Sequence, residues 1–115
     1  MKDYTSLKKN NSFQKVYKEG HSKANKYLVM YILENNLSIN RLGIQVSKKV
    51  GNSVVRHRLT RLIREAYRLN SNMFNSGLDI VIIARISAKD KNFKEIECAL
   101  MHLGKIQKIL VNDQN

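Results

Sequence analysis

The sequence predicts an α+β fold in which helices pack on one small sheet. Two segments have the composition and length of β-strands, and a third is a continuous apolar run of strand length. Three other segments place apolar residues three or four positions apart, as amphipathic helices do. The order along the chain is helix, two strands, helix, strand and helix. Elements mixed in this way form a layered α+β domain.

The chain is expected to be one domain over residues 1–115. Its length is common for a single domain, and it contains no proline, five scattered glycines and no internal repeat or linker-like segment. The ends, about residues 1–7 and 111–115, are expected to fray.

The first helix is expected to run from a cap at Asn11 or Ser12 to about Glu19, with Gly20 as a left-handed stop. Its apolar face is formed by Phe13, Val16 and Tyr17.

Three strands are expected, at residues 26–34, 41–47 and 78–85. The second alternates apolar and polar residues, whereas the third is apolar on both faces and is expected to be buried. Helices are expected at residues 51–68 and 92–110. The last of these opens with an asparagine and a glutamate at the spacing of a capping box.

The charge balance indicates a polyanionic partner. The chain has 21 Lys and Arg residues against 9 Asp and Glu, a formal net charge of +12. An anionic membrane surface is a minor alternative, because the longest apolar run, residues 27–33, has the length of a strand and not of a spanning helix.

Residues 51–68, GNSVVRHRLTRLIREAYR, combine an apolar stripe with an almost purely cationic face. In helical projection the stripe is Val55, Leu59, Leu62, Ile63 and Ala66. The opposite face carries His57, Arg61, Arg64 and Arg68, flanked by Arg56 and Arg58. A merely solvated face is less favoured, because like charges at this spacing destabilise a helix. Arginine forks suit phosphate, so the favoured partner is nucleic acid.

The entry to this helix also indicates phosphate binding. Lys48 and Lys49 follow a strand, and Gly51 and Asn52 open the helix, so ammonium groups and free backbone N–H groups converge there. A well-capped helix start is the alternative. The spacing differs from that of a nucleotide-binding P-loop, so hydrolysis of nucleoside triphosphates is not expected.

The aromatic residues have two interpretations. Phe13 and Tyr17 share a face of the first helix. One face of the first strand, if regular, carries Tyr27, Val29, Tyr31 and Leu33. If the two faces meet, the rings are core; if they border a cleft, they are platforms for unpaired bases. The sequence favours neither.

The sequence contains no recognisable catalytic or metal-binding set. No two acids have the placing of a catalytic pair, the three histidines lack metal-ligand spacing, and a single cysteine, Cys98, excludes an internal disulfide. The N-terminal segment lacks the apolar centre of a secretory signal, so a reducing cytoplasm is expected. The chain is predicted to bind folded nucleic acid, and its basic surface suits RNA as well as DNA.

The chain resembles the bacterial ribonuclease P protein subunit in three successive blocks: FQKVYKEGHSKANKYLVMY, RLGIQVSKKVGNSVVRHRLTRLIREAYR and DIVIIAR. The resemblance extends from about Leu7 to Leu110 and is most specific in the arginine-rich block. It implies a two-layer α/β sandwich, order αβββαβα, with a left-handed crossover, like domain 2 of ribosomal protein S5. Residues 23–34 are then expected to form two short strands.

The resemblance also implies a function. The protein joins a catalytic RNA, and the holoenzyme is an endoribonuclease that removes the 5′ leader of precursor tRNA in the cytoplasm. Mg²⁺, bound mainly by the RNA, supports hydrolysis by that RNA, so the protein alone is expected to be inactive. Neither DNA nor a membrane is an expected partner. Two alternatives are a non-catalytic RNA-binding protein of ribosomal type and a protein-only nuclease.

By position, the resemblance implies RNA contacts for Lys48, Lys49, Asn52, Arg56, Arg58, Arg61 and Arg64. The cationic face adds His57 and Arg68. Phe13, Tyr17 and Tyr31 are expected to line the cleft that holds the single-stranded leader. No catalytic or metal-ligating residue is expected in the protein. The sequence departs from the family pattern at His57, usually asparagine, and at Thr60, often lysine.

Overall fold

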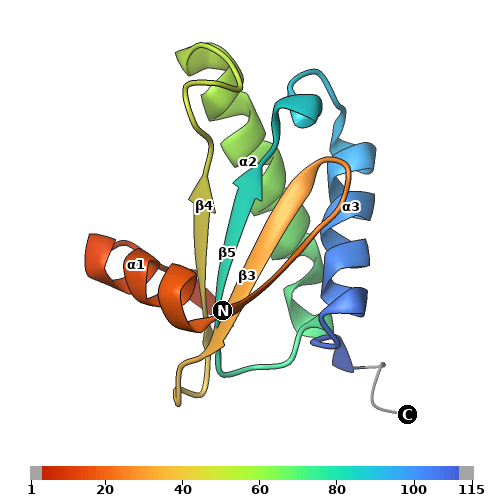
Figure 1. Ribbon diagram of the computed structural model, residues 1–115. Coiled ribbons are helices and arrows are strands. Elements are labelled where there is room, and N and C mark those ends of the chain that lie inside the picture. Colours follow the sequence, from red (N-terminus) through yellow and green to blue (C-terminus); the bar gives the residue numbers. More distant parts are fainter. Residues whose placement is uncertain (1–3, 112–115) are drawn as a thin grey trace.

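The structure is a computed structural model that describes residues 4–111, and a five-stranded sheet is its central element (Figure 1). The strands are β1 (Tyr4–Ser6), β2 (His21–Ala24), β3 (Leu28–Glu34), β4 (Asn40–Gln45) and β5 (Leu78–Ala84). The α-helices are α1 (Asn10–Glu19), α2 (Ser53–Asn70) and α3 (Phe93–Ile106). Single-turn 3₁₀ helices, η1 (Ser71–Met73) and η2 (Ile86–Ala88), follow α2 and β5.

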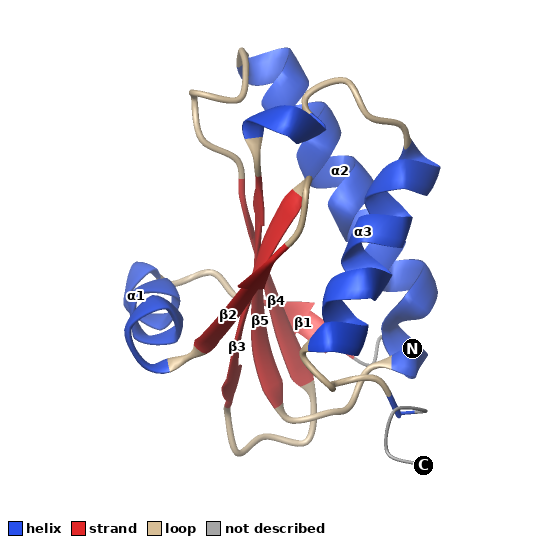
Figure 2. Cartoon of the chain, turned by 45° about the vertical axis from the view of Figure 1, so that its right-hand side comes forward, coloured by secondary structure: helices blue, strands red, loops and turns tan. Residues whose placement is uncertain are grey.

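The sheet mixes parallel and antiparallel pairs in the order β1-β4-β5-β3-β2. β4 pairs in parallel with β1 and β5, whereas β3 pairs antiparallel with β5 and β2. α2 and α3 lie side by side on one face, and α1 lies on the opposite face (Figure 2). This confirms the predicted sandwich of helices on one sheet. The separation of β2 from β3 is the split that the resemblance implied.

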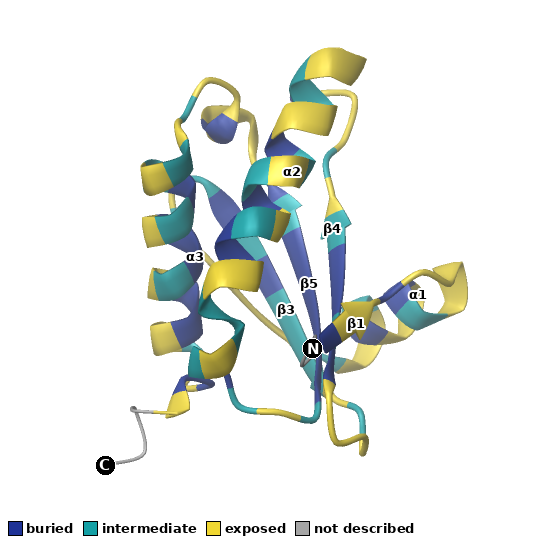
Figure 3. Cartoon of the chain, turned by 180° about the vertical axis from the view of Figure 1, so that it is seen from behind, coloured by how far each residue is buried: buried dark blue, intermediate teal, exposed yellow. Residues whose placement is uncertain are grey.

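α2 carries the chain from β4 to its parallel neighbour β5 by a left-handed crossover. Both strands point upward in Figure 1, and Figure 3, which views the sheet from the α2 side, places β5 to the left of β4. Such connections are right-handed in about 98% of cases, because of strand twist. The resemblance predicted this exception, and the structure confirms it.

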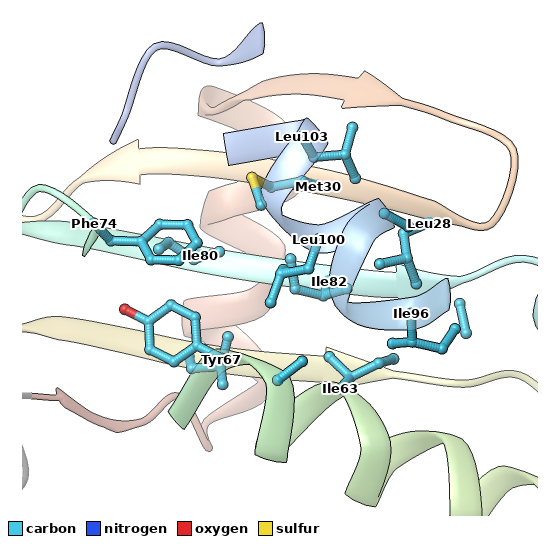
Figure 4. Close-up of a cluster of buried hydrophobic side chains, with 14 of the residues drawn as sticks. Leu28, Met30, Ile63, Tyr67, Phe74, Ile80, Ile82, Ile96, Leu100 and Leu103 are labelled. Atoms are coloured by element: carbon cyan, nitrogen blue, oxygen red, sulfur yellow. The ribbon is translucent and has the colours of Figure 1, made fainter. Parts of the chain in front are cut away.

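The main core fills the space between the sheet and the helices α2 and α3 (Figure 4). Its fully buried side chains include Leu28, Met30, Ile63, Tyr67, Ile80, Ile82, Ile96, Leu100 and Leu103. Buried Asn40 donates to Tyr67 Oη (3.0 Å) and to Asn75 O (2.8 Å). Its Oδ1 accepts from Leu78 N (2.8 Å). Because a buried amide is costly unless bonded, this network fixes α2 against the start of β5.

Residues 4–7 contradict the expectation that residues 1–7 fray. β1 pairs in parallel with β4, and the rings of Tyr4 and Tyr67 meet edge to face with centroids 4.9 Å apart. A strand of three residues shows too little periodicity to be recognised, so the observed order adds one strand to αβββαβα. Residues 1–3 and 112–115, which the same expectation covered, lie outside the described part of the chain.

Gly20 ends α1 for a steric reason and not through a left-handed turn. Its φ and ψ are −84° and 178°, an extended conformation, so the predicted left-handed stop is wrong. A Cβ at this position would lie 2.5 Å from Ile32 O and 2.6 Å from Val16 O. Glycine is required because the helix end lies directly against the backbone of β3.

The remaining helix boundaries differ by a few residues. α1 begins at Asn10, so neither Asn11 nor Ser12 is its cap. α3 ends at Ile106, earlier than expected, and the chain turns at Lys108, where φ is 60°. The capping box expected at the start of α3 is present.

Candidate nucleic-acid interface

α2 is oriented by its cap and by its apolar stripe. Oδ1 of Asn52 accepts a hydrogen bond from Val55 N (3.0 Å), which confirms Asn52 at the helix start. Of the predicted stripe, Leu59, Ile63 and Ala66 are buried, and Tyr67 is buried beside them. Burial of this side turns the opposite side of α2 outward, where Figure 3 shows exposed segments along the helix.

The outward side of α2 carries most of the predicted cations. Its exposed residues include His57, Arg58, Arg61, Arg64 and Arg68. Lys48 and Lys49 are also exposed, in the turn that leads into α2. The predicted RNA-binding residues therefore lie along one helix face and its entry, with one exception.

Arg56 is that exception, because its side chain is half-buried. Its Nε is buried and has no hydrogen-bond partner within residues 4–111. The Thr60 hydroxyl donates to Arg56 O (2.9 Å), so Thr60 bonds to its own helix. The two positions form the side of the cationic face that turns toward the protein.

The exposed arginines differ in the contacts that they already make within the protein. Arg68 pairs with Glu65, at 2.6 Å from Nε and 2.5 Å from Nη2 to Oε1. Arg58 donates from Nη2 to Lys91 O (2.6 Å) and, at 3.4 Å, from Nη1 to Lys89 O. These contacts leave fewer free donors on the face than the sequence indicated.

Three predicted cationic residues of α2 make no such contacts within the described part of the protein. His57, Arg61 and Arg64 make no side-chain hydrogen bond or ion pair with any residue in the described range. Their charges are therefore available to an external anion, and the arginines offer planar forks that match phosphate.

The aromatic residues divide between core and surface, so each interpretation holds for part of the set. Phe13 is buried with Val16 and Val81 in a small core beneath α1. Tyr17 and Tyr31 are half-buried, and their rings meet edge to face with centroids 5.1 Å apart. Burial and the neighbouring Tyr31 raise the pKa of Tyr17, so this phenol stays neutral and does not repel phosphate.

An uncovered strip of sheet lies beside this pair of rings. Strand register aligns Gln45, Ile83, Val29 and Ala24 in one row across four strands. On the same face of the sheet, this row is the neighbour of the row that contains Tyr31. Gln45 and Ala24 are exposed, and the two apolar residues between them are half-buried. The row lies on the α1 face because its residues are two positions along their strands from the row that α1 covers. Ile83, Gln45 and Ala24 were not among the predicted site residues; strand alternation indicates their face, but their alignment depends on the strand order.

The buried carboxylate of Asp79 stabilises the fold. Buried Asp79 accepts from Arg41 Nε (2.8 Å) and Nη2 (2.7 Å) and from Asn35 Nδ2 (2.9 Å). The hydrogen bonds from Arg41 to Asp79 raise the pKa of Arg41.

Within residues 4–111 no three His, Cys, Asp or Glu residues cluster as a metal site. No helix in the same range is long and apolar enough to cross a membrane.

Comparison with known proteins agrees with this geometry. The family model for ribonuclease P matches residues 1–107. The ribonuclease P protein component of Lachnoclostridium phytofermentans is 65% identical over 109 residues, which cover 95% of this chain and 94% of that protein. The solved ribonuclease P protein of Staphylococcus aureus superimposes with a TM-score of 0.84 at 41% identity, covering 95% of this chain and 98% of that one.

A second solved structure, the ribonuclease P protein of Thermotoga maritima, gives a TM-score of 0.82 at 32% identity and covers 88% of this chain and 96% of that one. These solved structures also confirm the fold class. The chain therefore belongs to the ribonuclease P protein family, whose members are subunits of the endoribonuclease that matures the 5′ end of tRNA.

Proposed function

We propose that this subunit binds the catalytic RNA of ribonuclease P through the exposed face of α2, and holds the 5′ leader of precursor tRNA on the uncovered sheet strip beside α1. One observation carries the proposal: Arg61 and Arg64 are exposed on a helix packed on the sheet and have no counter-ion in the described part of the chain. Unpaired arginines on a well-packed helix are suited to phosphate contacts.

The turn before α2 strengthens this face. Lys48 and Lys49 are exposed there, and the N-terminal N–H groups of α2 add a positive partial charge. We assign the contacts to phosphate and sugar, which suit exposed lysines and arginine forks. Such binding recognises the shape of folded RNA.

The proposed leader site combines two aromatic rings with the uncovered strip of sheet beside them. Tyr17 and Tyr31 present half-exposed rings, and base stacking on such rings contributes about 1–3 kcal/mol per base. The strip from Gln45 to Ala24 lies next to these rings, and the chain leaving β4 leads on to Lys48. An unpaired strand on the strip would thus lie between rings and lysines.

The protein's own residues do not fit Mg²⁺. This ion prefers carboxylate oxygens and water, whereas the α2 face is cationic and, in the described chain, no acidic cluster accompanies it. We therefore assign Mg²⁺ and hydrolysis to the catalytic RNA, and the protein's part is to bind and orient. We also propose that the subunit acts in the cytoplasm, together with these RNAs.

Cleavage of precursor tRNA by the catalytic RNA at low Mg²⁺, with and without this protein, tests the proposal. We expect the protein to raise the cleavage rate, and the gain to shrink as the leader is shortened. RNA binding without leader dependence would favour an RNA-binding protein of ribosomal type. Cleavage by the protein after removal of all RNA would indicate a protein-only nuclease.

A further inference from the structure

Arg58 joins two parts of the chain that are far apart in sequence. Its guanidinium lies on α2 and donates to the carbonyl oxygens of Lys91 (2.6 Å) and Lys89 (3.4 Å) in the loop between β5 and α3. These bonds engage two of the five N–H donors of the guanidinium. Arg58 therefore has fewer donors free for RNA than Arg61 or Arg64, and its two bonds tie the loop to α2.

The loop that Arg58 holds is also joined to the turn between β2 and β3. Arg85 donates from its backbone N–H to Tyr27 O (2.9 Å) and from Nη1 to Asn25 O (2.7 Å). The Ser87 hydroxyl donates to Lys26 O. Figure 1 shows this turn and this loop together, at the end of the sheet where α2 begins.

These contacts gather lysines around one aromatic ring. The Nζ atoms of Lys26 and Lys91 lie 5.7 Å and 5.4 Å from the ring centroid of Tyr27. Lys89 is exposed on the same loop. Lys26, Lys89 and Lys91, here called the loop lysines, form no ion pair with any acid in residues 4–111. The ammonium groups of Lys26 and Lys91 thus share one ring without a counter-ion, although like charges repel, and Lys89 adds a positive charge to the same loop.

The loop lysines are continuous with the cationic face of α2. A hollow of about 350 Å³ between α2 and the start of α3 is lined by Arg58, Arg61, Leu62, Glu65 and Phe93. A second hollow, of about 440 Å³, is lined by Ser53, Val54, His57, Arg58 and Arg61. Because Arg58 and Arg61 border both hollows, an RNA backbone on α2 has a concave route toward the loop.

We infer that the loop lysines are a second phosphate-binding surface for the catalytic RNA, and that Arg58 acts as a positioning residue that holds their loop against α2. The inference rests on the proposed function. Lysine is a compact point charge, and the Tyr27 ring already faces two ammonium groups, so the surface binds phosphate and does not stack bases.

Salt titrations of binding to the catalytic RNA alone, without precursor tRNA, test the surface. Each variant Lys26→Ala, Lys89→Ala and Lys91→Ala should flatten the dependence of log Kd on log salt by roughly one unit. Lys105→Ala is the matched control, because this exposed lysine lies in the last turn of α3, and its slope should equal that of the wild type.

Arg58→Lys tests the positioning role, because it keeps the charge but loses the fork that reaches two carbonyls. We expect it to weaken RNA binding nearly as much as Arg58→Ala and to speed amide hydrogen exchange in residues 86–91. Lys89→Ala should then add little further loss in the Arg58→Lys background. Full RNA affinity in Arg58→Lys, or additive losses, would show that Arg58 contacts RNA directly.

Salt titrations distinguish failure of the second surface from failure of the α2 interface. If the loop lysine variants keep the wild-type slope while Arg61→Ala flattens it, the second surface is refuted and the α2 interface stands. If Arg61→Ala also keeps the wild-type slope, the proposed function itself is refuted.

Discussion

The ring of Phe13 in α1 lies directly against Gly43 in β4, where a Cβ would come within 2.5 Å of Phe13 Cε1. This contact holds α1, which carries Tyr17, on the sheet beside Tyr31 of β3. Gly43→Ala should displace the ring and lower the free energy of unfolding by about 1–3 kcal/mol, as overpacking does. Chemical denaturation measures the loss, and Phe13→Leu in the same chain should recover part of it.

The Gly43→Ala variant should also separate the two RNA sites. Its affinity for precursor tRNA in the holoenzyme should fall, because α1 carries the leader-stacking Tyr17, while its affinity for the catalytic RNA should stay unchanged. Equal losses for both RNAs would mean that α1 does not act at a separate leader site.

Tyr17 is predicted to act through its ring and not through its hydroxyl. Tyr17→Phe should keep leader affinity, whereas Tyr17→Ala should lose about 1–3 kcal/mol of binding free energy for precursor tRNA with a long leader. The measurement is the Kd of the holoenzyme for precursor tRNA and for leaderless tRNA. A loss of equal size with leaderless tRNA would rule out stacking on the leader.

The arginines of α2 should contribute unequally to RNA binding. Arg61→Ala and Arg64→Ala should each flatten the salt dependence of catalytic RNA binding by roughly one unit. Arg68→Ala should change it less, because Glu65 already neutralises that guanidinium. Salt titrations of the three variants check this ranking, and an identical slope change for all three would contradict it.

Asp79 is predicted to stabilise the sheet through Arg41. Asp79→Asn should lower the free energy of unfolding by about 1–3 kcal/mol, because a buried carboxylate that accepts three hydrogen bonds is lost. The pKa of Arg41 is raised, so its contribution is present below the ordinary arginine range and is lost only as the pH rises through the folded value. The destabilisation should therefore be constant around neutral pH. Asp90→Asn, at an exposed acid, is the control.

Periodicity predicted the parts of the fold whose signal is local. The apolar stripe of α2 identified the helix and its outward face, because helical spacing alone determines which side chains share a side. β1 escaped prediction because its three residues have no pattern of their own, and its place depends on the edge of β4. Gly20 was misinterpreted because the collision it avoids involves Ile32, on another element.

The sequence predicted which residues form the candidate site better than it predicted the contacts that they make. The pairing of Glu65 with Arg68 is local, at i, i+3, and could have been inferred from the sequence. The bonds of Arg58 to the loop at Lys89 and Lys91 could not, because they depend on how α2 packs beside that loop. The sheet strip likewise required the strand order, which brings β2 and β4 into one row.

Leader-dependent binding of precursor tRNA tests the central claim most directly. The Kd for precursor tRNA and the Kd for leaderless tRNA should each be measured for the holoenzyme and for the catalytic RNA alone. Stacking of even one base at about 1–3 kcal/mol corresponds to a preference of roughly 5- to 150-fold for the leader-bearing substrate. We predict that the preference appears when the protein is present and is lost in the double variant Tyr17→Ala, Tyr31→Ala. An equal preference with the protein present or absent would contradict the account.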